Sequence, residues 1–177
     1  MAISVSLGIY LSERMEGPLK DCFMTFSGTP QMYRLNGSLT EKMAQLETAD
    51  WGMNTNLNAT FQQIVSVAKK NNLTKDDLPT TLLIISDMEF DAATRGSTNF
   101  EAARQLFEQY GYELPEVVFW NANGRPGNVP ITVNDKGVAL VSGASPAVVK
   151  SVLTGELDPE TIMLKALNSE RYSILNV

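Results

Sequence analysis

The amino-acid sequence predicts an α/β fold in which helices cover both faces of a largely parallel β-sheet. Strand-like and helix-like segments alternate over most of the 177 residues, a pattern typical of parallel sheets with right-handed crossover connections. Residues 80–88, TTLLIISDM, form a nearly continuous apolar run of the kind found in strands that are buried on both faces. The length suits one domain, and we expect a single domain over residues 1–177.

The amino-terminal residues 3–15 fit two patterns. Their apolar residues share one helical face, and they also alternate as in a strand. We favour the helix. Short strands are expected at 21–27 and 31–35, around the turn Gly28-Thr29-Pro30.

Two helices are expected in the next part of the chain. Residues 38–47 begin with Ser38 as the cap, and Glu41 stands where it completes a capping box. Residues 57–72 carry an apolar stripe formed by Phe61, Ile64, Val65 and Ala68.

The second half of the chain continues the alternation after the strand at 80–88. We expect a helix that ends at Gly111, because glycine is the usual residue after a helix terminus. Proline is favoured at the first helical position, so Pro146 and Pro159 mark the starts of two further helices. The segments are helix 98–112, strand 116–123, strand 137–143, helix 145–155 and helix 158–169.

Composition and charge restrict the function. The net charge of -6 argues against direct nucleic-acid binding by this chain alone, because such affinity comes largely from lysine and arginine. The sequence contains no histidine, which excludes histidine-based triads and the usual zinc sites. A single cysteine, Cys22, makes a reducing, cytoplasmic location the default. We also expect no membrane association, because no apolar run reaches the ~20 residues that span a bilayer.

Polar side chains follow several of the predicted strands, at the sheet edge where α/β proteins bind ligands. These residues are Ser27, Asn54 to Asn56, Asp87, Glu89 and Asn121 to Asn123. Hydroxyl and carboxylate oxygens at such an edge suit Mg²⁺, which needs only one or two protein carboxylates. By spacing alone the better interpretation is structural, with Thr55 capping a helix and Asp87 in a solvated loop.

Four segments of the sequence resemble a known family. DWGMNTNLNATFQQIV, TLLIISDMEFDAAT, LPEVVFWNAN and GVALVSGASPAVVKSVL together resemble a domain-of-unknown-function family within the von Willebrand factor A superfamily, related to the A-type domain of Ro ribonucleoproteins. The resemblance implies a Rossmann-like three-layer fold with a metal-ion-dependent adhesion site at the carboxyl edge of its sheet.

The resemblance assigns metal ligands residue by residue. Thr55 matches the family's threonine and Asp87 its later aspartate, with Ser27, Asn54 and Glu89 as weaker candidates. The family's Asp-x-Ser-x-Ser motif has no match, so the resemblance implies an amino-terminally incomplete domain that lacks the first, central strand. We therefore expect weak or absent binding of Mg²⁺ or another divalent cation.

Two functions are compatible with these observations. The first is a non-catalytic protein-interaction or ribonucleoprotein-associated module with a partial metal site. Its partner would be another protein or an upstream segment that supplies the missing strand, with self-association as a further possibility. The alternative is a small magnesium-dependent phosphoester hydrolase that uses Asp87 and Asp91. The hydrolase lacks a recognisable nucleophile, base or phosphate-binding glycine loop, so we favour the binding module.

Overall fold

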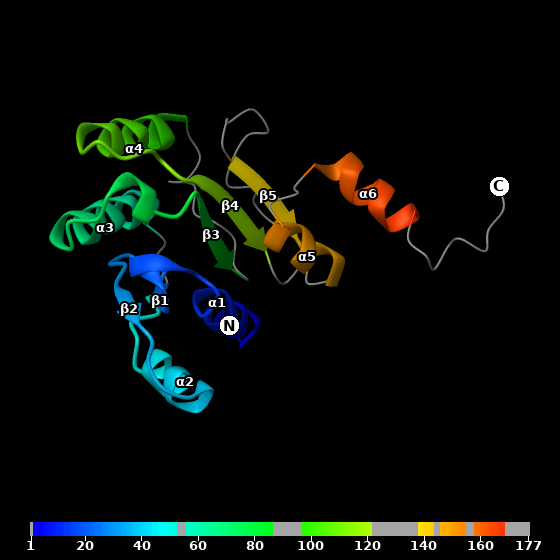
Figure 1. Cartoon of the computed structure of the whole chain (residues 1–177), viewed down its shortest axis with the longest axis horizontal. Coiled ribbons are helices and arrows are strands. Elements are labelled where there is room, and N and C mark those ends of the chain that lie inside the picture. The colour runs from blue at the N-terminus through cyan, green and yellow to red at the C-terminus, as the bar shows by residue number, and fades with distance from the viewer. Residues whose placement is uncertain are drawn as a thin grey trace.

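The chain folds as a mixed α/β structure (Figure 1). The computed structural model describes residues 2–52, 56–86, 97–121, 138–143, 146–154 and 158–168. None of the helices in these ranges is long and apolar enough to cross a membrane.

Three strands form a parallel sheet. They are β3 (Thr81–Ser86), β4 (Glu116–Asn121) and β5 (Val138–Ser142), in the order β3-β4-β5. Leu83 pairs with Val118 of β4, and Phe119 pairs with Leu140 of β5. These strands confirm the three that were expected in the second half of the chain, including the apolar run at 80–88.

The first two strands form a separate antiparallel pair, β1 (Cys22–Met24) and β2 (Met32–Arg34). Among the described residues this pair does not join the three-stranded sheet. The expectation of a largely parallel sheet is therefore right for β3, β4 and β5 and wrong for β1 and β2. Within the described part of the chain, residues 21–27 do not pair directly with residues 80–86, and the amino-terminal segment is the helix α1 (Ala2–Ser12) rather than a strand.

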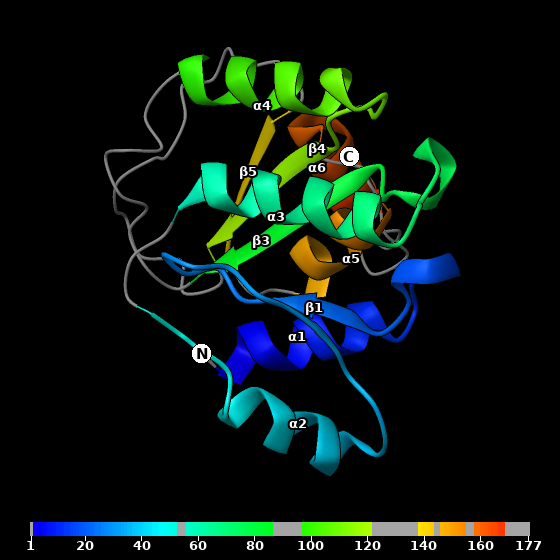
Figure 2. The ribbon, with the colours of Figure 1, turned by 90° about the vertical axis from the view of Figure 1, so that its left-hand side faces the viewer.

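The helices α3 (Leu57–Lys70) and α4 (Ser97–Gln109) lie on one side of the parallel strands, and α1 and α5 (Pro146–Thr154) lie on the other (Figures 1 and 2). Side chains of α3, α4, β3 and β4 form the main core. Its buried members are Leu57, Phe61, Ile64, Val65, Ala68, Ile84, Phe100, Ala103, Phe107, Tyr112, Val117 and Phe119. The stripe predicted on residues 57–72 is thus the buried face of α3. The last helix, α6 (Pro159–Leu167), also starts at the predicted proline.

A second, smaller core joins α1 and α2 (Leu39–Glu47) to the β1–β2 pair. Ile9, Leu35 and Leu46 are buried in it. α1 runs antiparallel to β1, because the carbonyl of Ser12 accepts a 2.9 Å hydrogen bond from the amide of Asp21, whereas Gly8 lies over the ring of Phe23.

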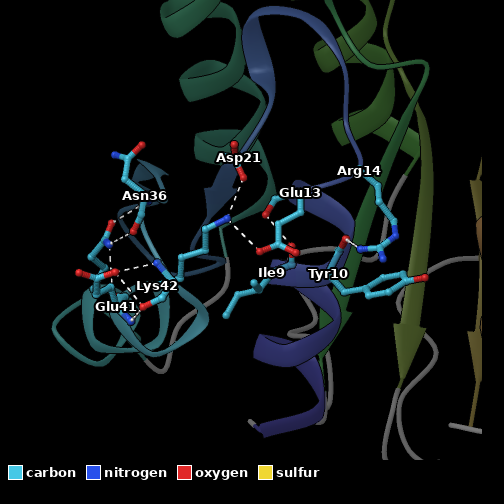
Figure 3. Close-up of polar contacts among 11 residues, drawn as sticks. Ile9, Tyr10, Glu13, Arg14, Asp21, Asn36, Glu41 and Lys42 are labelled. Atoms are coloured by element: carbon cyan, nitrogen blue, oxygen red, sulfur yellow. Dashed lines mark hydrogen bonds and ion pairs between the residues drawn. The ribbon is translucent and has the colours of Figure 1, made fainter.

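A buried lysine fixes α2 against α1 and the start of β1 (Figure 3). The side chain of Lys42 is 8% exposed, and its ammonium group lies 2.9 Å from a carboxylate oxygen of Glu13 and 2.9 Å from one of Asp21. At the start of the same helix, the predicted capping box is present. The hydroxyl of Ser38 accepts from the amide of Glu41 at 3.4 Å, and the carboxylate of Glu41 accepts from the amide of Ser38 at 2.7 Å.

Candidate functional site

Ser27 is the one predicted metal-ligand candidate that lies within the described residues, and it is completely buried. Its hydroxyl accepts a 3.3 Å hydrogen bond from the amide of Thr29, and its carbonyl accepts one of 3.3 Å from the amide of Asn56. These bonds hold the turn after β1 against the start of α3. They give Ser27 a structural role in the described arrangement.

The other candidates, Asn54, Thr55, Asp87, Glu89 and Asp91, lie outside the described residues, so their ligand or catalytic roles stay predictions. The described part of the chain contains no cluster of three or more acidic, cysteine or histidine side chains that could hold a metal ion.

The structural interpretation of Thr55 as a helix cap is wrong. α3 begins at Leu57, and its cap is Asn56, whose side-chain oxygen accepts a 3.0 Å hydrogen bond from the amide of Ala59. From this position the side-chain oxygen of Asn56 accepts from an amide of the first helical turn that has no partner within the helix.

The outer edge of β3 has no strand partner among the described residues. The carbonyl of Thr80 accepts a 2.9 Å hydrogen bond from the amide of Glu116 on the β4 side. Since backbone groups of successive strand residues point alternately to the two edges, Leu82 and Ile84 also bond toward β4. The amides and carbonyls of Thr81, Leu83 and Ile85 therefore point outward, and we call these groups the β3 edge.

β1 has a corresponding edge. The amide of Thr25 donates to the carbonyl of Gln31, and the carbonyl of Asp21 accepts from Leu35, so these two residues bond toward β2. By the same alternation, the backbone groups of Cys22 and Met24 point away from β2. We call these groups the β1 edge.

The β1 edge and the β3 edge face one another. Met24 and Phe26 pack against the core under α3 that also contains Ile84, and no residue of β2 belongs to that core. β1 is therefore the member of its pair that lies nearer β3, in agreement with Figure 1. On the opposite side, α1 contacts both β1 and β3. The space between the two edges is consequently covered by α3 on one face and by α1 on the other.

A cavity of about 360 Å³ lies at the amino ends of both edges. It is formed where the 3-10 turn Gly17–Leu19, just before β1, meets the turn Lys75–Asp77, just before β3. The contact between these turns shows that β1 and β3 start at the same end and run in the same direction. We call this space the entry cavity.

The entry cavity is lined by both apolar and acidic residues. Pro18, Leu19, Leu78 and Pro79 contribute apolar surface, and Glu16, Asp76 and Asp77 carry the charges, with no lysine or arginine among the lining residues. Hydrogen bonds from the hydroxyl of Thr74 (2.6 Å) and from its amide (2.8 Å) hold the pKa of Asp77 below its ordinary value. Asp77 is therefore an anion at neutral pH.

Cys22 lies on the β1 edge and is only partly buried. Burial raises the pKa of its thiol above the ordinary value, although the nearby Arg34 acts in the opposite direction. The thiol is therefore protonated at neutral pH and is a poor nucleophile, in keeping with a packing role.

Comparison with known proteins gives a family for this chain. The profile of a domain of unknown function, DUF7788, matches residues 1–172. The chain belongs to the DUF7788 family. No solved structure matches it significantly.

The chain is also similar to part of a longer protein. An uncharacterised protein of Acanthamoeba polyphaga mimivirus is 32% identical over 173 residues, which are 94% of this chain and 30% of the relative. The chain thus spans less than a third of that protein.

The sequence predicted a site at the carboxyl ends of the strands. It did not predict the entry cavity, which lies at their amino ends. Pro18 and Pro79 were the available signal, because proline before a strand often marks a turn. That the two turns meet depends on how the strands are arranged in space, which the local sequence pattern does not contain.

Proposed function

We propose that the DUF7788 domain is a non-catalytic binding module that takes up an extended polypeptide segment as a strand along the β3 edge. The observation that carries this proposal is the outward row of backbone groups at Thr81, Leu83 and Ile85, of which Leu83 and Ile85 are partly buried and Thr81 is exposed. A fully buried amide or carbonyl group left unpaired costs on the order of 1–3 kcal/mol, and a partly buried one costs less. A strand that pairs with these groups would therefore gain part of this free energy on binding.

The helices that cover this edge favour binding of one extended segment over binding of a second folded copy of the chain. α1 and α3 lie over the two faces of the space between β1 and β3, so the sheet of another molecule would collide with them. A single strand needs only the width of one backbone, about 4.8 Å from each neighbour.

We propose that this segment precedes Ala2 in a longer polypeptide. Because α1 runs antiparallel to β1, its first residues lie near the carboxyl ends of β1 and β3. A preceding strand parallel to β3 would end there and lead directly into α1. The resulting strand–α1–β1 connection is a crossover unit of the kind that joins parallel strands.

The von Willebrand factor A resemblance supports the same arrangement. In that superfamily a central strand carrying Asp-x-Ser-x-Ser lies between the strands that correspond here to β1 and β3. Such a strand would bring an aspartate and two serines to the carboxyl edge, where Thr55 and Asp87 would complete a divalent-cation site. On this proposal the chain alone binds Mg²⁺ weakly, because most of the ligands come from the added segment.

A peptide-binding experiment tests the proposal. The probe is a synthetic peptide of six apolar residues followed by Asp-x-Ser-x-Ser, and its control replaces two alternate apolar residues by proline, which removes ladder amides. At a hundredfold excess over Kd, binding adds about 2.7 kcal/mol to the free energy of unfolding. For a domain of this size the melting temperature then rises by roughly 5–10 °C.

Two results would overturn the proposal. One is a melting temperature that neither peptide changes, together with a monomer at every concentration in light scattering. The β3 edge would then bind neither a peptide nor a second copy of the chain, and it would be stable without a partner. The other is magnesium-dependent turnover of a generic phosphoester that Asp87→Ala abolishes, which would support the hydrolase.

A further inference from the structure

We infer that Asn36 is a site of spontaneous deamidation, where the asparagine side chain reacts with the next backbone amide and is converted to aspartate or isoaspartate. Asn36 lies between β2 and α2 and is followed by Gly37. This inference does not depend on the proposed strand addition.

The reaction takes place within the chain. The amide nitrogen of Gly37 loses its proton and attacks the side-chain carbonyl carbon of Asn36, so that a new carbon–nitrogen bond closes a succinimide ring. The side-chain nitrogen gains a proton and leaves as ammonia. Water then opens the ring, at the former side-chain carbonyl to give aspartate or at the backbone carbonyl to give isoaspartate. Neither step needs an oxidant or a metal.

The attacking amide is available in the folded chain. None of the hydrogen bonds found among the described residues involves the amide of Gly37, although those on both sides of it are engaged. Gly37 is exposed and has a φ of 89°, in the region that favours glycine. Because glycine has no side chain, nothing on its own Cα hinders the approach of its nitrogen to the carboxamide of Asn36.

Two other exposed asparagines, in the turn after α3, are protected by comparison. The amide of Asn72, which follows Asn71, donates to the carbonyl of Lys69 at 3.1 Å. The amide of Leu73, which follows Asn72, donates to the carbonyl of Ala68 at 2.9 Å. Each of these hydrogen bonds must break before the amide can attack. This turn therefore serves as an internal control for Asn36.

Isoaspartate at position 36 would disturb the start of α2. The carbonyl of Asn36 accepts a 2.8 Å hydrogen bond from the side chain of Gln45, and its amide donates to the same side chain at 3.3 Å (Figure 3). Gly37 leads directly to Ser38, the cap of α2. Isoaspartate inserts one more carbon into the backbone between these two sets of contacts, so they cannot both keep their geometry. Aspartate adds a charge but leaves the backbone length unchanged.

Mass spectrometry of the aged chain tests the site. Cleavage after lysine and arginine releases residues 35–42 and residues 71–75 as separate peptides, so one sample reports both places. Peptide 35–42 should deamidate at about the same rate whether the chain is aged folded or unfolded in urea. Peptide 71–75 should deamidate about fivefold more slowly in the folded chain than in urea, because a hydrogen bond must break first.

Variants identify the reacting residue and the effect on α2. Asn36→Gln keeps the carboxamide but requires a larger ring, so peptide 35–42 should stay unmodified, whereas Asn72→Gln should leave its conversion unchanged. The acidic fraction of the aged chain should melt about 2–4 °C below the parent protein, as for loss of a helix cap. Freshly prepared Asn36→Asp should melt close to the parent protein, because it adds only the charge.

Three results would overturn the inference. If folding slows the deamidation of peptide 35–42 as strongly as that of peptide 71–75, the fold protects the bond between Asn36 and Gly37. If Asn36→Gln leaves the modification of peptide 35–42 in place, the reacting residue is misassigned. If the acidic fraction and Asn36→Asp melt at the same temperature, the change in backbone length does not disturb α2.

Discussion

At Gly8, the ring of Phe23 occupies the place that a side chain would need. This close contact sets the distance between α1 and β1. Gly8→Val should therefore lower the free energy of unfolding by about 2 kcal/mol through overpacking, despite a small gain in helix propensity. Urea denaturation measures the change.

A second substitution shows whether the ring is the cause. Combined with Phe23→Ala, Gly8→Val should cost at least about 1 kcal/mol less than it does alone. The matched control is Ser6→Val on an exposed position of α1, for which we expect a change within about 0.5 kcal/mol. Equal effects of Gly8→Val with and without the Phe23 ring would contradict this explanation.

Because of Lys42, the free energy of unfolding should fall as the pH rises through the alkaline range. Hydrogen bonds to Asp21, and then to Glu13, raise the pKa of Lys42 above its ordinary value of 10.5. A folded-state pKa above the unfolded value means that the stabilisation is complete below pH 10.5 and is lost as the pH rises through the folded-state pKa.

Lys42→Met should thus lower the melting temperature near neutral pH, and its difference from the parent protein should narrow above pH 10.5. Lys20→Met, at an exposed position, serves as the control and should show no comparable narrowing. A difference for Lys42→Met that stays constant through the alkaline range would show that the ammonium charge is irrelevant.

The helix α2 depends on its capping box. Ser38→Ala removes the acceptor for the amide of Glu41 and should cost about 1 kcal/mol. The loss should be visible in urea denaturation as a lower midpoint with an unchanged slope. Ser38→Asp, which keeps a side-chain acceptor, should recover most of it, and a failure of aspartate to do so would point to some other role for this position.

At the scale of elements, local patterns predicted much of the structure. The capping residues of α2, the stripe of α3, the terminating glycine after α4 and the first-position prolines of α5 and α6 are all local signals, and each is confirmed. The ambiguous segment at 3–15 is resolved as α1 by its packing on Phe23 and in the core around Ile9. The pairing of β1 with β2 alone could not be foreseen from alternation, because strand partners are chosen over long distances in sequence.

The candidate site was predicted less completely. Ser27 was identified from its place after a strand, yet its hydroxyl accepts from Thr29 inside the fold. Asn56 took the capping role considered for Thr55, since α3 starts one residue after it. The remaining ligand candidates, Thr55 and Asp87 above all, lie outside the described residues and stay predictions.

In the molecule as a whole, two cores meet at two strands that do not pair. One core lies around α3, β3 and β4, and the other around α1, α2 and the β1–β2 pair. α1 and α3 connect them across the β1 edge and the β3 edge. A strand added there would merge the two sheets into one and should therefore stabilise both cores together.

Amide hydrogen exchange along β3 tests this account most directly. In the isolated chain, the amides of Leu82 and Ile84 bond to β4 and should exchange slowly, whereas those of Leu83 and Ile85 point outward and should exchange at least tenfold faster, because they lack strand partners. Addition of the peptide of six apolar residues followed by Asp-x-Ser-x-Ser should selectively slow the exchange of the amides of Leu83 and Ile85. Equal protection of all four amides in the isolated chain, unchanged by the peptide, would contradict the open β3 edge on which the proposed function depends.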